Sequence, residues 1–382
     1  MKLKYVLGGG AALVATAAVT IAVVFHYADL GAVNLPVNDP GAGRLPMYRS
    51  ACYVAAHERR GEPCIEPALP AAEAGTGARV RAHLARAVFE IDMQEPEKAL
   101  REVDAAIALD AGSAEARHLA ARLSLTLFDI DRAEREIVIA RKLAPQDPQI
   151  GTTYAAVLVG RQANREAVGV LDDVIRRHPN YLFARKEHAT LFAYMGECCA
   201  RGNYQVALAD YDYLIRHGVP ESGLLAQRAA ALLAIGRPEP AVADLTAALA
   251  LAPDDALLLI SRAEAYAVLE RDDLAVKDYD AVLTDVAPGV PLHVLPNDRR
   301  AKLLAARALS LVQLKRFSDA VNDVVAAISV GGKAAILRAQ VLLRRHGFPD
   351  VPIDGENSSQ LRQALSACFG LKACYQPVMR AI

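Results

Sequence analysis

The sequence predicts an all-α protein: a right-handed α-solenoid of about seven helix-turn-helix repeats, followed by a small helical cap. Three observations predict this fold. An alanine with a large aliphatic or aromatic residue four positions later recurs seven times, at intervals of 34, 34, 40, 34, 34 and 45 residues. A second alanine stands twelve positions before six of them, and a proline twelve positions after three. The seven alanines are Ala99, Ala133, Ala167, Ala207, Ala241, Ala275 and Ala320.

The spacing of these alanines has a physical meaning. Two antiparallel helices approach closely only where both carry small side chains, so each pair of alanines marks a crossing point. In the fourth repeat the upstream alanine is Ala189, displaced by six residues. The pattern resembles the tetratricopeptide repeat, whose period is 34 residues. Such a unit cannot bury its apolar face alone, so neighbouring units must stack.

The composition narrows the class of function. The 382 residues carry a formal net charge of −1 and are 53% hydrophobic. No broad basic surface is expected, so nucleic acid is a poor candidate partner. The sequence shows no catalytic triad, phosphate loop or metal motif, and its nine histidines are scattered. We therefore expect neither an enzyme nor a bound cofactor or metal.

The amino-terminal segment, residues 1–28, is hydrophobic. Residues 5–28 contain no Asp, Glu, Lys or Arg, and a helix needs about 20 residues to cross a bilayer core. Lys2 and Lys4 precede this run and the next basic residue is Arg44, so the positive-inside rule predicts export of everything that follows. We expect a single-pass protein of a bacterial inner membrane, with its bulk in the periplasm.

The same segment also fits a signal peptide. Ala15-Thr16-Ala17 is a small-x-small cleavage site, and cleavage there gives a secreted or periplasmic protein. The apolar run continues past this site, which favours the uncleaved anchor. Both interpretations export the rest of the chain.

Residues 29–78, rich in Pro, Gly and Ala, are interpreted as a tether. Cys52 and Cys64 within it are separated by eleven residues, a spacing compatible with a local disulfide in an oxidising compartment. The alternative is two free thiols. His57 is the only other metal-ligand type nearby, so no closed zinc site is expected.

The repeats are expected over residues 79–332, with two insertions. Glu197–Gly202 is expected to lengthen an inter-helix turn, and Pro288–Asn297 adds a proline-rich loop. Insertions in solenoids map to loops on one face, often a binding face, and the alternative is a tolerated loop. The adjacent Cys198 and Cys199 are expected as free thiols, with a strained vicinal disulfide as the alternative.

A second periodicity places arginine and aspartate at fixed positions. An arginine precedes the small residue of the first helix, and an aspartate precedes the large residue of the second. Recurrence in one register favours scaffold ion pairs between stacked helices. The residues are Arg86, Arg228, Arg262, Arg307, Asp210, Asp244, Asp278 and Asp323.

The tetratricopeptide resemblance implies an inner groove lined by the first helix of each repeat. Most of its residues are small or apolar, which suits a partner's amphipathic helix or extended peptide. The family's carboxylate clamp is not reproduced, and the alternative occupant is another part of this chain. By register, the lining residues are Leu84, Val88, His118, Arg122, Thr152, Ala156, Lys186, Thr190, Ala226, Ala230, Ile260, Glu264, Ala305 and Leu309.

Residues 333–382 carry a further pattern. Gln340-x-x-Leu343-x-x-x-Gly347-Phe348 is followed by Asp354-Gly355 and then Ala364-Leu365. This resembles a small three-helix peptidoglycan-binding domain of bacterial envelope proteins. Ser358, Leu361 and Cys368-Phe369 depart from that family's pattern, so the resemblance implies a helical frame and leaves wall binding open.

Cys368 and Cys374 in the same segment are separated by five residues, which favours a disulfide that ties the tail to the last helix. The main interpretation of the segment is a cap that hides the apolar face of the last repeat. We therefore predict a non-enzymatic adaptor that binds a protein or peptide partner in the groove. The alternative is a peptidoglycan-binding protein that acts through residues 333–382, with the repeats as a spacer.

Overall fold

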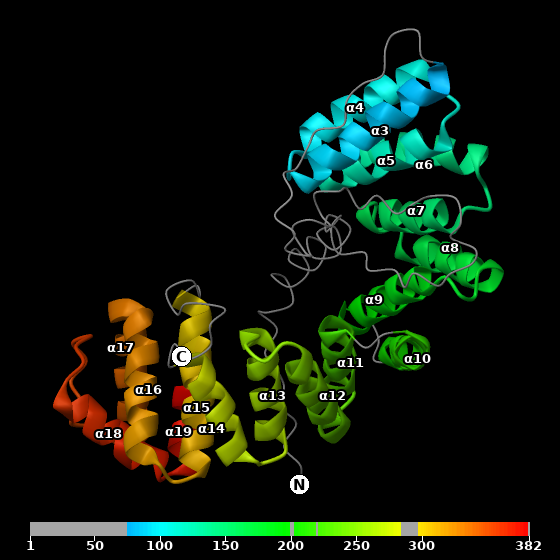
Figure 1. Ribbon diagram of the computed structural model, residues 1–382. Coiled ribbons are helices and arrows are strands. Elements are labelled where there is room, and N and C mark those ends of the chain that lie inside the picture. Colours follow the sequence, from blue (N-terminus) through cyan, green and yellow to red (C-terminus); the bar gives the residue numbers. More distant parts are fainter. Residues whose placement is uncertain (1–74, 199–201, 219–220, 284–296, 381–382) are drawn as a thin grey trace. The chain divides into compact units, whose positions relative to one another are not determined.

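The computed structural model describes residues 75–198, 202–218, 221–283 and 297–380, which are helices and turns (Figure 1). The chain divides into two compact units, residues 1–219 and 220–382. The predicted membrane or signal segment, nearly all of the tether, and Cys52 and Cys64 lie outside the described residues. Among the described helices, none is long and apolar enough to cross a membrane.

The first unit contains four helical hairpins, in which each helix packs on the next along the chain. The hairpins are α3 (Thr76–Asp92) with α4 (Pro96–Leu109), α5 (Ala114–Thr126) with α6 (Ile130–Leu143), α7 (Pro148–Gly160) with α8 (Asn164–Arg177), and α9 (Leu182–Cys198) with α10 (Gly202–His217). Because α3 begins at Thr76, the last three residues assigned to the tether are helical.

The second unit contains three hairpins and a cap of three helices. The hairpins are α11 (Ser222–Ala234) with α12 (Pro238–Leu251), α13 (Ala256–Val268) with α14 (Asp272–Leu283), and α15 (Asn297–Gln313) with α16 (Phe317–Val330). The cap consists of α17 (Gly332–Arg345), α18 (Ser359–Phe369) and α19 (Lys372–Arg380).

The periodic alanines form the centre of every hairpin. All seven alanines of the second helices, from Ala99 to Ala320, have no exposed surface. The seven alanines of the first helices, including the displaced Ala189, are equally buried. The large residues four positions on are at most 1% exposed, with Tyr211 and Tyr279 among the largest fully buried side chains. The helix register predicted from spacing is therefore the register of the core.

In six of the seven hairpins, the turn between the two helices has a left-handed backbone residue five positions before the alanine of the second helix. Only one of the six described cases is a glycine, Gly236, with φ of 79°. The others have φ between 57° and 62°. A non-glycine residue in this conformation costs about 1–2 kcal/mol, so five of these turns are strained. The non-glycine residues are Gln94, Phe128, Gln162, Glu270 and Lys315.

The predicted loop at Glu197–Gly202 is wrong. Helix α9 has 17 residues where α5, α7, α11 and α13 have 13, and α10 has 16 where α6, α8 and α12 have 14. Glu197 and Cys198 thus belong to α9 and Gly202 to α10 instead of to a loop, and residues 199–201 lie outside the described residues. A Cβ on Gly196 would lie 2.8 Å from ring atoms of Tyr204, so glycine allows the extended helices to pack closely. The second insertion lies largely outside the described residues.

The cap shares one hydrophobic core with the last hairpin. Leu343, Leu361 and Leu365 have no exposed surface and belong to the same cluster as Val324 and Ile328 of α16. Cys368 and Cys374 form a disulfide between α18 and α19. The cap therefore covers the apolar end of the second unit's hairpins, as a terminal repeat requires.

Candidate functional site

The predicted arginine–aspartate pairs hold the hairpins of the second unit together. Arg228 makes two hydrogen bonds to Asp244 at 2.6 and 2.7 Å, and Arg262 makes two to Asp278 at 2.7 and 2.8 Å. Arg307 bonds Asp323 at 2.5 and 2.7 Å in the same way. Each pair joins the first and second helix of one hairpin. These charges are architecture and do not form a binding site.

In the extended hairpin a histidine replaces the arginine of this pair. His188 Nδ1 lies 2.5 Å from Asp210 Oδ2, and its Nε2 lies 3.2 Å from Asp172 Oδ1 on the preceding hairpin. Arg185, one turn earlier, reaches the same Asp210 at 2.9 Å. The sequence pattern found Asp210 and missed its two partners, because the six-residue displacement moves them out of register.

We call the side of the first helices that carries the predicted groove residues the inner face of each unit. In the first unit most of these residues are buried. Leu84, Val88 and His118 are 2%, 5% and 6% exposed, and so offer little surface to a partner. Thr152 and Ala156 are buried as well. The groove prediction is therefore corrected at these positions, because their side chains are buried within the packing of the unit.

A buried polar cluster lies at the same place. His118 Nε2 is 2.8 Å from Thr153 Oγ1, which joins α5 to α7. Burial, together with the neighbouring Arg122 cation, lowers the pKa of His118 to about 3. Burial also lowers the pKa of Arg122 and raises that of Tyr181. The imidazole is consequently neutral at physiological pH and acts as a packed hydrogen-bonding group.

Farther along the first unit, Lys186 and Thr190 are half-buried on α9. The Thr190 hydroxyl donates to the Lys186 carbonyl oxygen at 2.9 Å, within the helix. Burial raises the pKa of Tyr211, whose side chain is hydrogen-bonded to Thr190. This hydroxyl pair therefore belongs to the packing between α9 and α10.

The inner face of the second unit is different, because it is open. Ala230 and Glu264 are exposed, and Ala226, Ile260 and Leu309 are half-buried. The first helices α11, α13 and α15 that carry them contact one another in turn. The residues predicted for the groove thus retain exposed surface in this unit, and all of them except Glu264 are small or apolar.

Two further residues on this face were missed by the sequence reasoning. Leu257 and Val268 of α13 are 62% and 57% exposed, the two highest values among the large hydrophobic side chains of the described residues. They lie three positions before Ile260 and four after Glu264, so helical spacing puts all four on one side of α13. The helical spacing of these four residues is the sequence signal from which Leu257 and Val268 could have been predicted.

Glu264 is the one acidic side chain predicted for the groove. Although its side chain is exposed, the surrounding protein removes enough water to raise the pKa of its carboxyl. A carboxylate in this setting favours a cationic group in a bound partner.

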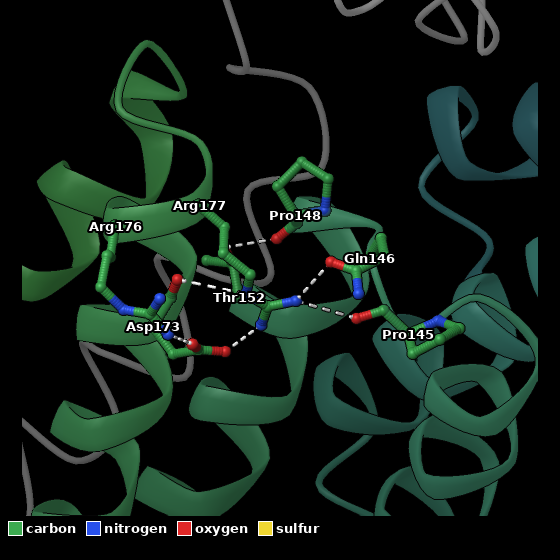
Figure 2. Close-up of polar contacts among 7 residues, drawn as sticks. All are labelled: Pro145, Gln146, Pro148, Thr152, Asp173, Arg176 and Arg177. Carbon is green, nitrogen blue, oxygen red and sulfur yellow. Dashed lines mark hydrogen bonds and ion pairs between the residues drawn. The ribbon is translucent and has the colours of Figure 1, made fainter.

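A cavity of about 360 Å³ lies in the first unit, where the turn between α6 and α7 meets α8. Arg177 is one of its lining residues. The guanidinium donates to Gln146 Oε1 at 2.8 Å and to the Pro145 carbonyl oxygen at 3.2 Å, and it pairs with Asp173 (Figure 2). Since its donors are engaged within the protein, Arg177 joins two hairpins, and we assign no ligand to the cavity.

The wall-binding-like motif serves the cap's own turn. Gly347 and Gly355 have φ of 100° and 75°, conformations that favour glycine. Asp354 Oδ1 accepts hydrogen bonds from the Gln340 side chain at 2.8 Å and from the Glu356 backbone N–H at 2.9 Å. These bonds lower the pKa of Asp354. Phe348 is half-buried against the cap core. The motif residues are thus engaged in folding the segment between α17 and α18.

Among the residues that the structure describes, no three His, Cys, Asp or Glu side chains gather in a way that could hold a metal ion. The fold and its buried alanine register define a helical-hairpin repeat protein. No protein-family model and no curated protein matches the chain.

Several solved structures resemble this chain in fold at low sequence identity. A tetratricopeptide repeat protein from Parabacteroides merdae is 13% identical with a TM-score of 0.46, over 75% of this chain and 98% of that one. The C-terminal part of a repeat protein from Cytophaga hutchinsonii is 16% identical with a TM-score of 0.49, over 64% and 92%. PilW, a type IV pilus biogenesis factor, is 15% identical with a TM-score of 0.49, over 56% and 96%. These values carry no argument about function, so the chain's own repeat register remains the basis of the resemblance.

Proposed function

We propose that the protein is a non-enzymatic scaffold that binds a segment of a partner protein on the inner face of its second unit. The observation that carries this proposal is the exposure of Ala230, Leu257 and Val268 on neighbouring first helices of one compact unit. Aliphatic side chains left this exposed on a helix face mark protein-binding surfaces.

The chemistry of this face suggests the partner. Ala226 and Ala230 leave room for a helix or an extended backbone to approach α11 closely, and the aliphatic side chains of α13 provide the apolar contacts. Glu264 favours a lysine or arginine on the bound segment, because its carboxylate is partly desolvated. The partner segment is therefore amphipathic, with a basic residue beside its apolar side.

We further propose that the scaffold is exported and anchored to the bacterial inner membrane by residues 5–28. The uncharged run and the preceding lysines support this location, and the Cys368–Cys374 disulfide is typical of an oxidising compartment. A reporter active only in the cytoplasm, fused after residue 382, should be silent. Activity of that reporter would contradict export.

The binding proposal is tested by photo-crosslinking from two positions in cells. A photoreactive residue at position 230, on the inner face, should crosslink to a defined protein partner. The same residue at the exposed position 247 of α12 should not. A crosslink from a photoreactive residue at position 257 of the same face should disappear in Ala226→Asp/Ala230→Asp, since unpaired carboxylates oppose burial against an apolar segment.

The control for that variant carries the same two charges at the same helical spacing. Ala243 and Ala247 are both exposed on α12, so Ala243→Asp/Ala247→Asp should leave a crosslink from Leu257 intact. Equal labelling from positions 230 and 247, or equal loss in both double variants, would reject the inner face as the binding surface.

The alternative function is peptidoglycan binding through residues 333–382, and one observation favours it: the turn on which the family resemblance rests is formed, with Asp354 and Glu356 exposed. A wall-binding protein should sediment with purified sacculi, and Ala226→Asp/Ala230→Asp should leave that sedimentation unchanged. A scaffold that acts only through the inner face should remain in the supernatant.

A further inference from the structure

The charges of the second unit are segregated along its length. Residues 221–283, which form α11 to α14, contain five Lys or Arg and eleven Asp or Glu, a formal charge of −6. Residues 297–380, which form α15 to α19, contain thirteen Lys or Arg and six Asp or Glu, a formal charge of +7. The formal net charge of the whole chain is −1 and therefore does not reveal this separation.

The separation is present on the surface. The arginine–aspartate pairs of the hairpins cancel internally and leave the exposed residues to set the sign of each half. On the acidic half these include Glu239, Asp254 and Asp273. On the basic half the helices α17, α18 and α19 contain no Asp or Glu, and Arg338, Arg344 and Arg345 of α17 are exposed.

Both halves also expose aliphatic side chains. On the acidic half Leu251 and Leu274 are 56% and 36% exposed, and on the basic half Leu314, Ile353 and Leu371 are 37%, 47% and 55% exposed. Charges alone are well solvated and need no partner. Charged surfaces interspersed with exposed aliphatic groups on both halves indicate an interface.

We propose that two copies of the chain associate through their second units in an antiparallel, two-fold dimer, with the acidic half of each copy facing the basic half of the other. A two-fold axis pairs each surface with its complement twice, so the assembly closes at two copies. A parallel arrangement would place like charges face to face, which is unfavourable. This interaction goes beyond the proposed partner binding and does not depend on it.

The test is the mass of the full chain in detergent, measured by sedimentation at about 0.05 M and about 0.5 M NaCl. Dimers are expected at low salt, with association weakened on the order of tenfold or more at high salt, because screening acts on exposed charges. Arg338→Glu/Arg344→Glu/Arg345→Glu should be monomeric at low salt, as should Glu239→Lys/Asp254→Lys/Asp273→Lys.

Mixing the two triple variants decides the geometry. The arginine reversals change the basic half from +7 to +1, and the lysine variant changes the acidic half from −6 to 0. Only a mixed pair places a half of charge −6 against a half of charge +7, so an equimolar mixture should form a heterodimer at low salt. The control Arg101→Glu/Arg135→Glu/Arg165→Glu reverses three exposed charges in the first unit and should dimerise as the unaltered chain does.

Four results would overturn the proposal: a monomeric chain at low salt, assemblies larger than a dimer, no complex in the mixture, or dissociation of the control. Circular dichroism of each variant should show unchanged helix content, and a variant that fails this check is replaced by reversals of Arg299, Arg300 and Lys302, which are basic residues of α15.

Discussion

Gln340 and Asp354 are joined by a reciprocal set of hydrogen bonds. The Gln340 amide donates to Asp354 Oδ1 at 2.8 Å, and its carbonyl oxygen accepts the backbone N–H groups of Asp354 and Gly355 at 3.2 and 2.9 Å. The amide also donates to the Glu356 carbonyl oxygen at 3.0 Å, and Gln340 has no exposed surface, so one buried side chain bonds four polar groups of the cap. The most motif-like residues of the carboxy-terminal segment therefore have an architectural role that spacing alone did not show.

Replacing this glutamine should destabilise the cap. Gln340→Leu leaves buried backbone N–H groups without acceptors, at about 1–3 kcal/mol for each group. We expect the free energy of unfolding of the second unit to fall by roughly that amount, measured by urea denaturation. Gln363→Leu, at an exposed position of α18, should change it by less than about 0.5 kcal/mol. Equal effects would mean that the buried network contributes nothing specific.

The stability of the first unit should depend on pH through His118. The folded-state pKa is about 3, whereas an unfolded imidazole titrates near 6.5. Between these values the unfolded chain binds a proton that the folded chain does not, so stability is full above about pH 6.5 and is lost as the pH falls. From about pH 7.5 to 5 the loss is on the order of 2 kcal/mol.

The variant His118→Gln keeps a hydrogen-bonding group beside Thr153 and removes the titration. Urea denaturation across this pH range should show a shallower fall in unfolding free energy than in the unaltered chain. His217→Gln, at an exposed position of the same unit, should retain the steeper fall. Parallel curves for all three proteins would show that His118 does not titrate differently on folding.

Glycine at the hairpin turns should have effects of opposite sign to glycine within a helix. A Cβ at Gly236 would meet nothing within 4 Å, so Gly236→Ala costs only its left-handed backbone strain, about 1 kcal/mol. Gly169, in helix α8, also has open space around its Cβ position, and Gly169→Ala should stabilise by about 1 kcal/mol.

The reverse change at a strained turn completes this series. Gln162→Gly relieves strain but adds freedom to the unfolded chain, so the unfolding free energy should rise by up to about 1 kcal/mol. Thermal melts of the three variants give the order of their stabilities relative to the unaltered chain. A stabilising Gly236→Ala would exclude strain as a feature of these turns.

Breaking one arginine–aspartate pair should cost more than removing both members. Asp278 is 4% exposed, so Arg262→Leu leaves a buried carboxylate without its partner and should cost on the order of 3 kcal/mol. The double variant Arg262→Leu/Asp278→Leu should recover most of this loss, since no buried charge remains. Additive losses in a double-mutant cycle would contradict the pairing.

The sequence by itself determined the helical register and the ion pairs of the second unit. Ala99, Ala241 and their counterparts recur because each hairpin needs small residues at one crossing point, and a local steric requirement of this kind leaves a period in the sequence. The pairs Arg228–Asp244 and Arg262–Asp278 could be predicted for the same reason, since both members occupy fixed positions in a single hairpin.

The tertiary structure determined two features that the repeat period of the sequence does not encode. Cys198 lies in α9 and Gly202 begins α10, and Gly196 packs against Tyr204 across that hairpin, where sequence spacing indicated only extra length. Exposure of the inner face also differs between units: His118 of α5 is 6% exposed, whereas Leu257 on the same side of α13 is 62% exposed. Both outcomes depend on how side chains pack between helices, and such packing leaves no fixed spacing in the chain.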